Sequence, residues 1–295
     1  MRRESGILLP ITSLPSPYGI GCFSREAYEF IDYLKKAGQS YWQILPLGPT
    51  SYGDSPYQSF STFAGNPYFI SLEDLIEEGV LTREECAQAD PEVQEDSIDY
   101  AKLYEERYPL LRLAYERSDI SKNADFVRFC QENDWWLSDY ALFMAVKARF
   151  GGKAWTKWAQ DIRLRWGNAL DYYRRELYFD IEFHKYLQFT FFKQWSRLKA
   201  YANRQGIRII GDIPIYVAMD SADAWANPSL FQLDENNRPL AVAGCPPDGF
   251  SATGQLWGNP LYNWEYHRNT GYSWWISRLA HCYRVYDVVR IEHFR

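Results

Sequence analysis

Four short apolar runs, separated by helical patterns, constrain the fold of this chain more than any other feature. The runs are GILLPI (6–11), YWQILPL (41–47), IRIIGDIPIYV (207–217) and YDVVRIEHF (286–294). They are largely apolar rather than cleanly alternating, which is typical of strands covered on both faces in a parallel sheet. The sequence therefore predicts an α/β protein with these four runs as buried parallel strands.

Helical patterns fill the intervals between these runs. Segment 24–38 begins at a serine and ends in two lysines before a glycine, so its capping and dipole signals agree. Together with the runs on either side, it predicts a strand–helix–strand unit. A second helix is expected over 71–79, and Thr82 with Glu85 forms a capping box at the start of a third.

The patterns divide the chain into three segments. Residues 1–79 carry the first two strands and a loop rich in Gly, Ser and Pro, and residues 206–295 carry the last two strands. Residues 80–205 are predicted to be a mostly helical insertion, whose apolar stripe over 183–198 is typical of core packing. Residues 218–260 show little regular pattern, and so long a loop inside a compact domain is more often functional than idle.

This order of elements fits two architectures, an open doubly wound sheet and a (β/α)8 barrel. No G-x-G-x-x-G follows any of the strand-like runs, so a dinucleotide-binding sheet lacks support. Polar residues gather at the carboxyl ends of the runs, which is where barrels build their active sites. The barrel is therefore favoured.

Charge and composition argue against several classes of function. The net charge of −6 gives no basic surface for nucleic acid. No apolar run approaches the roughly 18–20 residues of a membrane span. The opening apolar run is broken by Pro10, so no signal peptide is expected. The five cysteines are scattered and form no C-x-x-C pair, which predicts free thiols in a reducing cytoplasm. The four histidines also lie far apart in the sequence, so no metal site is expected.

The aromatic content is unusual at 18%, with 12 Trp, 23 Tyr and 17 Phe. Flat rings with polar tips suit the faces of sugars, because the apolar C–H side of a pyranose stacks on the ring while a hydroxyl meets the Tyr O–H or Trp N–H. Ordinary core packing must nevertheless explain most of these rings. Composition alone leaves both interpretations open.

The chain closes on VVRIEHFR (288–295), in which a strand pattern runs into charged residues. Because side chains alternate along a strand, Arg290 and Glu292 share one face and His293 lies on the other. At the mouth of a barrel, the arginine would favour the ionised carboxylate, which could attack an anomeric carbon in a retaining glycosyl transfer. The same spacing also fits a structural Arg–Glu pair.

Three other stretches place polar and aromatic residues after strands. Asp212 in GDIPIYV could accept hydrogen bonds from sugar hydroxyls, orient the neighbouring arginine, or simply occupy a strand-end turn. The loop 51–68 contains Tyr57 among glycines and serines, and loops of this kind place rings at a barrel mouth. The glycine-rich loop 246–262, with Trp257, could fold over a ligand and exclude water, or could be a surface connection.

Long motifs in these stretches identify a family. The segments GDIPIYVAMDSADAWANPSLFQLDE, AVAGCPPDGFSATGQLWGNPLYNW and RIEHFR, with the opening GILLPITSLPSPYGIGCF and ILPLGPTSYGDSPYQSFSTFAGNPY, resemble 4-α-glucanotransferases of the amylomaltase type. These are also called disproportionating enzymes and form glycoside hydrolase family seventy-seven. The resemblance spans nearly the whole chain.

This resemblance implies a (β/α)8 TIM barrel with helical insertions, of which about the first four strands are present. The implied reaction is retaining transfer of an α-1,4-glucan segment, from maltooligosaccharides or amylose, onto another glucan or onto glucose. It implies no metal or organic cofactor, and a cytoplasmic role in maltodextrin metabolism.

The family motif Arg-Ile-Asp-His-Phe-Arg matches the end of the chain. Glu292 takes the position of the family's nucleophilic aspartate, Arg290 matches the arginine that holds the nucleophile, and His293 matches a sugar-contacting histidine. Asp212 matches the family's aspartate on strand three. All four are expected to lie at the mouth of the barrel.

The remaining matches lie in two loops. Tyr57 matches a ring that stacks on the donor sugar beside the cleaved bond, and Ser55 lies next to it. Asp248, Gln255 and Trp257 fall in the family's mobile loop over the acceptor side.

Several departures from the family pattern bear on activity. Gly249 stands where the family often has a tyrosine, so a stacking contact is expected to be missing. Glu292 adds a methylene to the nucleophile and moves its oxygen by about 1.5 Å, which is enough to cost roughly a hundredfold in rate. The family's acid/base glutamate and third carboxylate lie on later strands, so the chain is expected to be the front part of a longer enzyme. An α-amylase-type hydrolase and a non-catalytic glucan-binding fragment remain alternatives.

Overall fold

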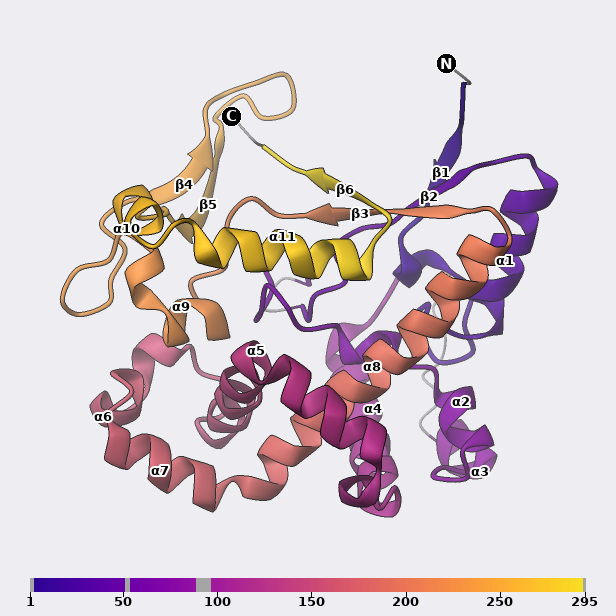
Figure 1. Cartoon of the computed structure of the whole chain (residues 1–295), viewed down its shortest axis with the longest axis horizontal. Coiled ribbons are helices and arrows are strands. Elements are labelled where there is room, and N and C mark those ends of the chain that lie inside the picture. The colour runs from indigo at the N-terminus through magenta and orange to yellow at the C-terminus, as the bar shows by residue number, and fades with distance from the viewer. Residues whose placement is uncertain (1–2, 51–53, 89–96, 294–295) are drawn as a thin grey trace.

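The computed structural model describes residues 3–50, 54–88 and 97–293 of the chain. Its centre is a sheet of four parallel strands in the order β1-β2-β3-β6 (Figure 1). These strands are β1 (Gly6–Leu8), β2 (Tyr41–Gln43), β3 (Arg208–Ile213) and β6 (Val288–Ile291). Each lies inside one of the four predicted runs, so the four parallel strands are confirmed.

Prolines interrupt the first three runs: Pro214 directly follows β3, Pro10 stands two residues after β1 and Pro46 three residues after β2. A proline has no backbone N–H for a ladder bond, so regular pairing does not continue through these positions. The prediction that all four strands are covered on both faces is wrong for β1 and β6, which form the two edges of the sheet in the described chain. All three residues of β1 are exposed, and no residue of β6 is buried.

Three helices connect the strands and pack on the sheet. They are α1 (Arg25–Lys36), α8 (Tyr178–Arg204) and α11 (Ser273–Val285), which precede β2, β3 and β6 respectively. The main core joins their apolar faces to the sheet. The predicted stripe on α8 is buried throughout, and within it Trp195 Nε1 donates a hydrogen bond to the carbonyl oxygen of Val285 at 3.0 Å.

The helices between β2 and β3 include several that the caps predict. Ser71 Oγ accepts from the backbone N–H of Asp74 at 3.2 Å, and the capping box of Thr82 and Glu85 forms in both directions, at 3.0 and 3.3 Å. The helices of this region are α2 (Leu72–Glu77), α3 (Arg83–Gln88), α4 (Tyr100–Arg117), α5 (Ala124–Arg149), α6 (Gln160–Arg163) and α7 (Gly167–Glu176). Helix α8 packs against α5 as well as against α1 and β3. The core on the sheet extends into α2, α3 and α4, whereas most buried residues of α5 form a second cluster with those of α6, α7 and α9 (Ala222–Ala226).

Residues 218–260 are more regular than expected. They contain α9 (Ala222–Ala226) and an antiparallel hairpin of β4 (Val242–Cys245) and β5 (Gln255–Pro260). The prediction of little regular structure is therefore wrong here. The sequence does not reveal β4 and β5, because their pairing is interrupted near Val242 and the turn between them is rich in Gly and Pro. The strands β3 and β6 point toward this hairpin (Figure 1).

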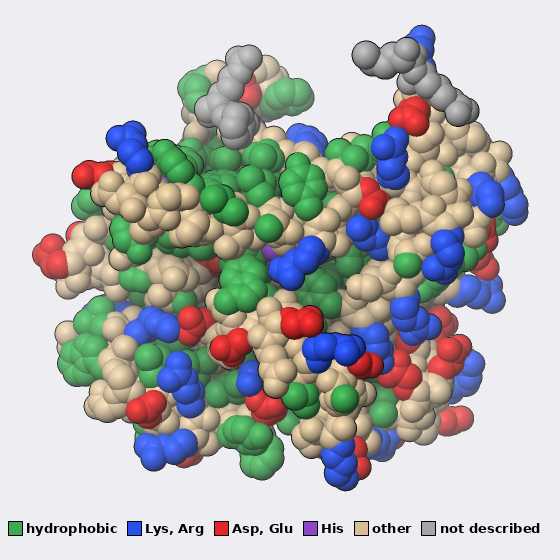
Figure 2. Space-filling model, viewed as in Figure 1, with side chains coloured by type: hydrophobic (Ala, Val, Ile, Leu, Met, Phe, Trp, Pro, Cys, Tyr) green, Lys and Arg blue, Asp and Glu red, His purple; other side chains and the backbone are tan. Residues whose placement is uncertain are grey.

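Core packing accounts for much of the aromatic content. Trp42, Trp155, Trp195 and Trp225 are all at most 1% exposed. Other apolar side chains gather on the surface over α11 and α10 (Trp264–Asn269), as Figure 2 shows. Within the three described ranges, no helix is both long enough and apolar enough to cross a membrane.

Candidate active site

The parallel register of β3 and β6 sets Asp212 opposite Arg290. Arg290 Nη1 donates to Asp212 Oδ2 at 2.7 Å and to Glu292 Oε1 at 2.9 Å. The Asp212 side chain is 1% exposed, whereas those of Glu292 and Arg290 are 20% and 46% exposed. One guanidinium therefore joins a buried carboxylate behind it to a more accessible carboxylate at the end of the sheet.

The loop after β2 adds a third group to this network. Tyr57 donates its hydroxyl proton to the same Asp212 Oδ2, at 2.9 Å. The other oxygen, Oδ1, is buried and has no hydrogen-bond partner among the described residues. Of the roles left open for Asp212 by the sequence, these contacts favour orientation of Arg290 and Tyr57.

Burial and mutual contacts shift the pKa values of Asp212, Tyr57 and Arg290. Burial raises the pKa of Asp212, and the negative charge of Glu292 adds to this, while the hydrogen bond from Tyr57 and the charge of Arg290 oppose it. Burial, followed by the hydrogen bond to Asp212, raises the pKa of Tyr57, so its hydroxyl remains a donor. The hydrogen bond to Glu292 raises the pKa of Arg290.

The end of β6 departs from strand geometry. The strand stops at Ile291, and His293 has φ = 46°, in the left-handed region. The predicted strand alternation over 286–294 is therefore wrong at Glu292 and His293, because the chain turns there (residue 294 lies outside the described residues). Glu292 N–H still donates to the Ile213 carbonyl at 3.4 Å, which keeps Glu292 against β3.

The hairpin brings aromatic rings to the same place. The ring of Trp257 on β5 lies 4.8 Å from that of His293 and 6.2 Å from that of Tyr216, between centroids. Trp257 Nε1 donates to Gln255 Oε1 at 2.9 Å. The structure thus brings four of the predicted residues, Glu292, Arg290, His293 and Trp257, to one end of the sheet.

Asp248 lies in the turn of the hairpin. Its Oδ1 accepts from the backbone N–H groups of Phe250 at 2.9 Å and Ser251 at 2.8 Å, and these bonds lower its pKa. Phe250 is 98% exposed. A side chain at Gly249 would meet nothing within 4 Å, so the backbone does not require glycine there. Asp248 therefore shapes the turn, and the charge of His293 also contributes to its lowered pKa.

Ser55 and Gln58 shape the loop that presents Tyr57. Ser55 Oγ accepts from the Tyr57 N–H at 3.3 Å, and the Ser55 carbonyl accepts from the Gln58 N–H at 3.1 Å. The structure adds Gln58, which the sequence does not single out, and pairs it with Asn259 of the glycine-rich loop: Gln58 Nε2 donates to Asn259 Oδ1 at 3.0 Å. The partners are 201 residues apart, so no local pattern could have revealed them.

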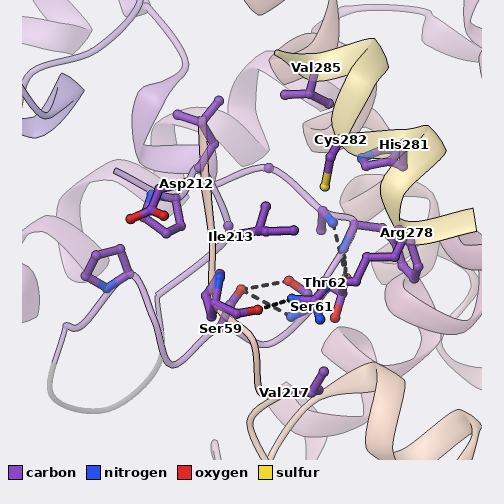
Figure 3. A pocket seen from close by; sticks show the side chains of 18 of the residues that line it. Ser59, Ser61, Thr62, Asp212, Ile213, Val217, Arg278, His281, Cys282 and Val285 are labelled. Atoms are coloured by element: carbon purple, nitrogen blue, oxygen red, sulfur yellow. Dashed lines mark hydrogen bonds between the residues drawn. The ribbon is translucent and has the colours of Figure 1, made fainter. Parts of the chain in front are cut away.

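A cavity of about 60 Å³ lies beside this network, between the loop after β2, the end of β3 and α11 (Figure 3). Arg278 of α11 donates to the Ile215 carbonyl at 3.1 Å and to the Tyr262 hydroxyl at 3.0 Å, and it also bonds the Pro214 carbonyl. Helix α11 thereby holds the segment that follows Asp212. Burial lowers the pKa of His281, which also lines the cavity, to about 4.

The described residues offer no constellation for a metal. Over residues 3–50, 54–88 and 97–293, no three His, Cys, Asp or Glu side chains come together as potential ligands. The chemistry that the arrangement can supply is that of an accessible carboxylate held by a guanidinium, next to aromatic surfaces.

Comparisons with known proteins agree with this geometry. The family model described as 4-alpha-glucanotransferase matches residues 9–295. The 4-alpha-glucanotransferase of Streptococcus pneumoniae is 51% identical over 100% of this chain and 59% of its own length. That of Thermus thermophilus is 50% identical over 99% of this chain and 58% of its own length.

A solved structure gives the same result. The amylomaltase from Streptococcus agalactiae in complex with acarbose matches with a TM-score of 0.96 and 47% identity, covering 99% of this chain and 60% of that chain. This match confirms the predicted fold, a (β/α)8 barrel with helical insertions, of which four strands lie in this chain. The chain spans about 59% of the length of the curated relatives that it matches. It belongs to the 4-alpha-glucanotransferase family.

Proposed function

We propose that the full-length protein transfers α-1,4-glucan segments between maltooligosaccharides by a retaining double displacement in which Glu292 is the nucleophile. The observation that carries this proposal is the single guanidinium of Arg290 shared by Asp212 and Glu292. It holds an accessible carboxylate oxygen at the carboxyl end of the parallel sheet, which is where barrel enzymes act. Membership of the family supports the choice of reaction.

In the first step, a Glu292 oxygen attacks the anomeric carbon of the donor glucan. The bond from that carbon to the leaving oxygen breaks, and an acid outside these 295 residues protonates the leaving oxygen. The product is a covalent glycosyl ester of Glu292. Arg290 donates to the attacking carboxylate and fixes its direction, and Asp212 with Tyr57 fixes Arg290 from behind.

In the second step, the 4-hydroxyl oxygen of another glucan, or of glucose, attacks the anomeric carbon of the ester from the acceptor side. The bond to Glu292 breaks and releases its carboxylate, and the residue that acted as acid in the first step takes the hydroxyl proton. Transfer exceeds hydrolysis only if this side binds sugar well and excludes water. The rings of Trp257 and His293 lie 4.8 Å apart, His293 directly follows Glu292, and such rings are suited to the apolar face of a glucose unit. We assign acceptor binding to these two rings, with Gln255 holding the Trp257 indole.

The remaining predicted residues take supporting roles in this proposal. Tyr57 would present its ring to the donor sugar while its hydroxyl bonds Asp212. Ser55 holds the turn that presents Tyr57, and Asp248 holds the hairpin turn in a conformation from which it could close over a glucan. The relative from Streptococcus agalactiae was solved with acarbose, which supports an oligosaccharide as the ligand class.

We place this activity in the cytoplasm, in the metabolism of maltodextrins derived from starch or similar glucans. All five cysteines lie in the described part of the chain and none is disulfide-bonded, which fits a reducing compartment.

Incubation of the full-length protein with maltotriose tests the proposal. Transfer predicts a ladder of longer maltooligosaccharides together with glucose. An α-amylase-type hydrolase would give only shorter products, which would contradict transfer.

One observation favours a second candidate, a glucan-binding protein without transfer activity. Glutamate stands at the position of the family's aspartate, and its longer side chain changes the approach to the anomeric carbon. Calorimetry with maltoheptaose, alongside the maltotriose assay, separates the two. Binding without any ladder would support the second candidate.

A further inference from the structure

A pair of side-chain amides joins the β4–β5 hairpin to the loop that carries Tyr57. Gln58 Nε2 donates to Asn259 Oδ1 at 3.0 Å and lies 3.4 Å from the carbonyl oxygen of Trp257. Asn259 Nδ2 donates to the carbonyl oxygen of Val217 at 3.0 Å. The Asn259 amide therefore ties together the loop after β2, the segment after β3, and β5.

The orientation of this pair is fixed by its partners. Asn259 is 4% exposed, and its amide nitrogen already faces the Val217 carbonyl. A reversed Asn259 amide would set two acceptor oxygens against each other, so its Oδ1 must face Gln58. Gln58 Nε2 therefore supplies the shorter bond of the pair, and Asn259 Nδ2 in turn lies 3.5 Å from Gln58 Oε1. A glutamate at position 58 would keep the acceptor but lose the donor of the shorter bond.

Both partners adjoin residues of the proposed reaction. Gln58 directly follows Tyr57, whose hydroxyl binds Asp212, and Asn259 is on the same strand as Trp257. The ring contacts of Trp257 with His293 and Tyr216 are apolar and allow sliding, whereas a hydrogen-bonded amide pair sets a distance and a direction.

We infer that Gln58 and Asn259 are positioning residues that fix the hairpin relative to the nucleophile and thereby favour attack by a sugar over attack by water. This inference rests on the proposed transfer reaction. Without the pair, the hairpin keeps its ring contacts and its own β-ladder, so the protein folds. The hairpin then has more freedom above Glu292, and water reaches the glycosyl ester more often.

Hydrogen–deuterium exchange tests whether the Gln58–Asn259 pair restrains the hairpin, and it needs no assay of activity. In the full-length protein, Gln58→Ala should speed exchange of peptides covering 242–260 by roughly two- to tenfold, the amount expected for one lost hydrogen bond. Gln39→Ala is the matched control, because Gln39 lies before β2 at the other end of the sheet and its amide bonds only a nearby carbonyl. Exchange that is unchanged by Gln58→Ala would overturn the inference.

A double-mutant cycle tests the consequence for the reaction. Gln58→Ala and Asn259→Ala should each lower the ratio of transfer to hydrolysis by roughly two- to tenfold, and the double variant should lower it no further. Gln58→Glu keeps the shape and the acceptor oxygen but removes the donor of the 3.0 Å bond, so it should also lower the ratio. A ratio of transfer to hydrolysis that is unchanged in the single variants would contradict the inference, and so would losses that add up in the double variant. A lower unfolding midpoint with an unchanged ratio would also contradict it, because the pair would then contribute to stability alone. If the unmodified protein makes no longer maltooligosaccharides, the proposed function fails. The exchange measurement still tests whether the Gln58–Asn259 pair restrains the hairpin.

Discussion

Asp212 and Arg290 face each other across β3 and β6, and their side chains meet at 2.7 Å although one is buried and the other is half exposed. The half-exposed guanidinium of Arg290 is thus held in place by the buried carboxylate of Asp212. Because Arg290 also bonds Glu292, the position of the proposed nucleophile depends on Asp212.

Replacement of Asp212 should therefore damage turnover more than substrate binding. Asp212→Asn keeps the size of the side chain but removes the charge that holds Arg290, and a shift of about 1 Å in the nucleophile costs on the order of a hundredfold. We expect kcat to fall by roughly ten- to a hundredfold with KM changed less than threefold. Steady-state kinetics on maltotriose measures both. A large rise in KM at unchanged kcat would instead show that Asp212 binds sugar directly.

Trp257 should affect the partition of the reaction more than its first step. Trp257→Ala removes the ring beside His293, and loss of such a stacking surface costs about 0.5–1.5 kcal/mol beyond its buried area. The ratio of transfer to hydrolysis should fall by roughly threefold to tenfold. The matched control is Trp166→Ala, since Trp166 is 48% exposed at the start of α7. An equal ratio in both variants would refute the role assigned to Trp257.

The salt bridge between Lys147 and Asp220 should stabilise the helical region against the segment after β3. Lys147 Nζ lies 2.6 Å from Asp220 Oδ2, and the two side chains are only 6% and 23% exposed. Lys147→Met leaves Asp220 without its cation, and the free energy of unfolding should fall by about 2–4 kcal/mol. Urea denaturation measures this loss. Lys122→Met is the control, because its pair with Asp119 is exposed and should change stability by less than about 0.5 kcal/mol. Equal effects would show that burial does not matter here.

Asp223 predicts a pH dependence of stability. Burial raises its pKa to about 6, although its carboxylate accepts the Thr62 N–H at 2.8 Å. Because the folded state binds this proton more tightly than the unfolded chain, the group lowers stability as the pH rises from about 4 to about 6. Asp223→Asn can still accept from Thr62, so it should be more stable than the parent by about 1–3 kcal/mol at pH 7 and equal to it below about pH 4. Denaturation at several pH values checks this, and a difference that does not vary with pH would contradict it.

The sequence was sufficient to predict the four parallel strands and several of the helices. Apolar runs of strand length and caps such as Thr82 with Glu85 depend on neighbours in the chain, and both appear in the structure where they were expected. The Arg290–Glu292 contact joins residues two apart in the chain, as expected, although β6 ends at Ile291 between them. These features need no knowledge of the rest of the fold.

Other features depend on contacts between distant segments. Asp212 is buried and bonded by Tyr57 and Arg290 from two other segments, and the turn at His293 ends the strand alternation. The Gln58–Asn259 pair joins the loop after β2 to strand β5. Polar residues after strands show that a site exists, but only the packed structure shows which of them meets a ligand and which holds its neighbours.

Identification of the residue that carries the sugar tests the central claim most directly. The full-length protein would be mixed with an activated glucosyl donor, quenched with acid and digested, and the peptides would be weighed and sequenced by mass spectrometry. We predict one glucosyl unit on Glu292, and none on that peptide in Glu292→Gln. A glucosyl unit on another carboxylate, or an enzyme that turns over while Glu292 stays unlabelled, would contradict the account.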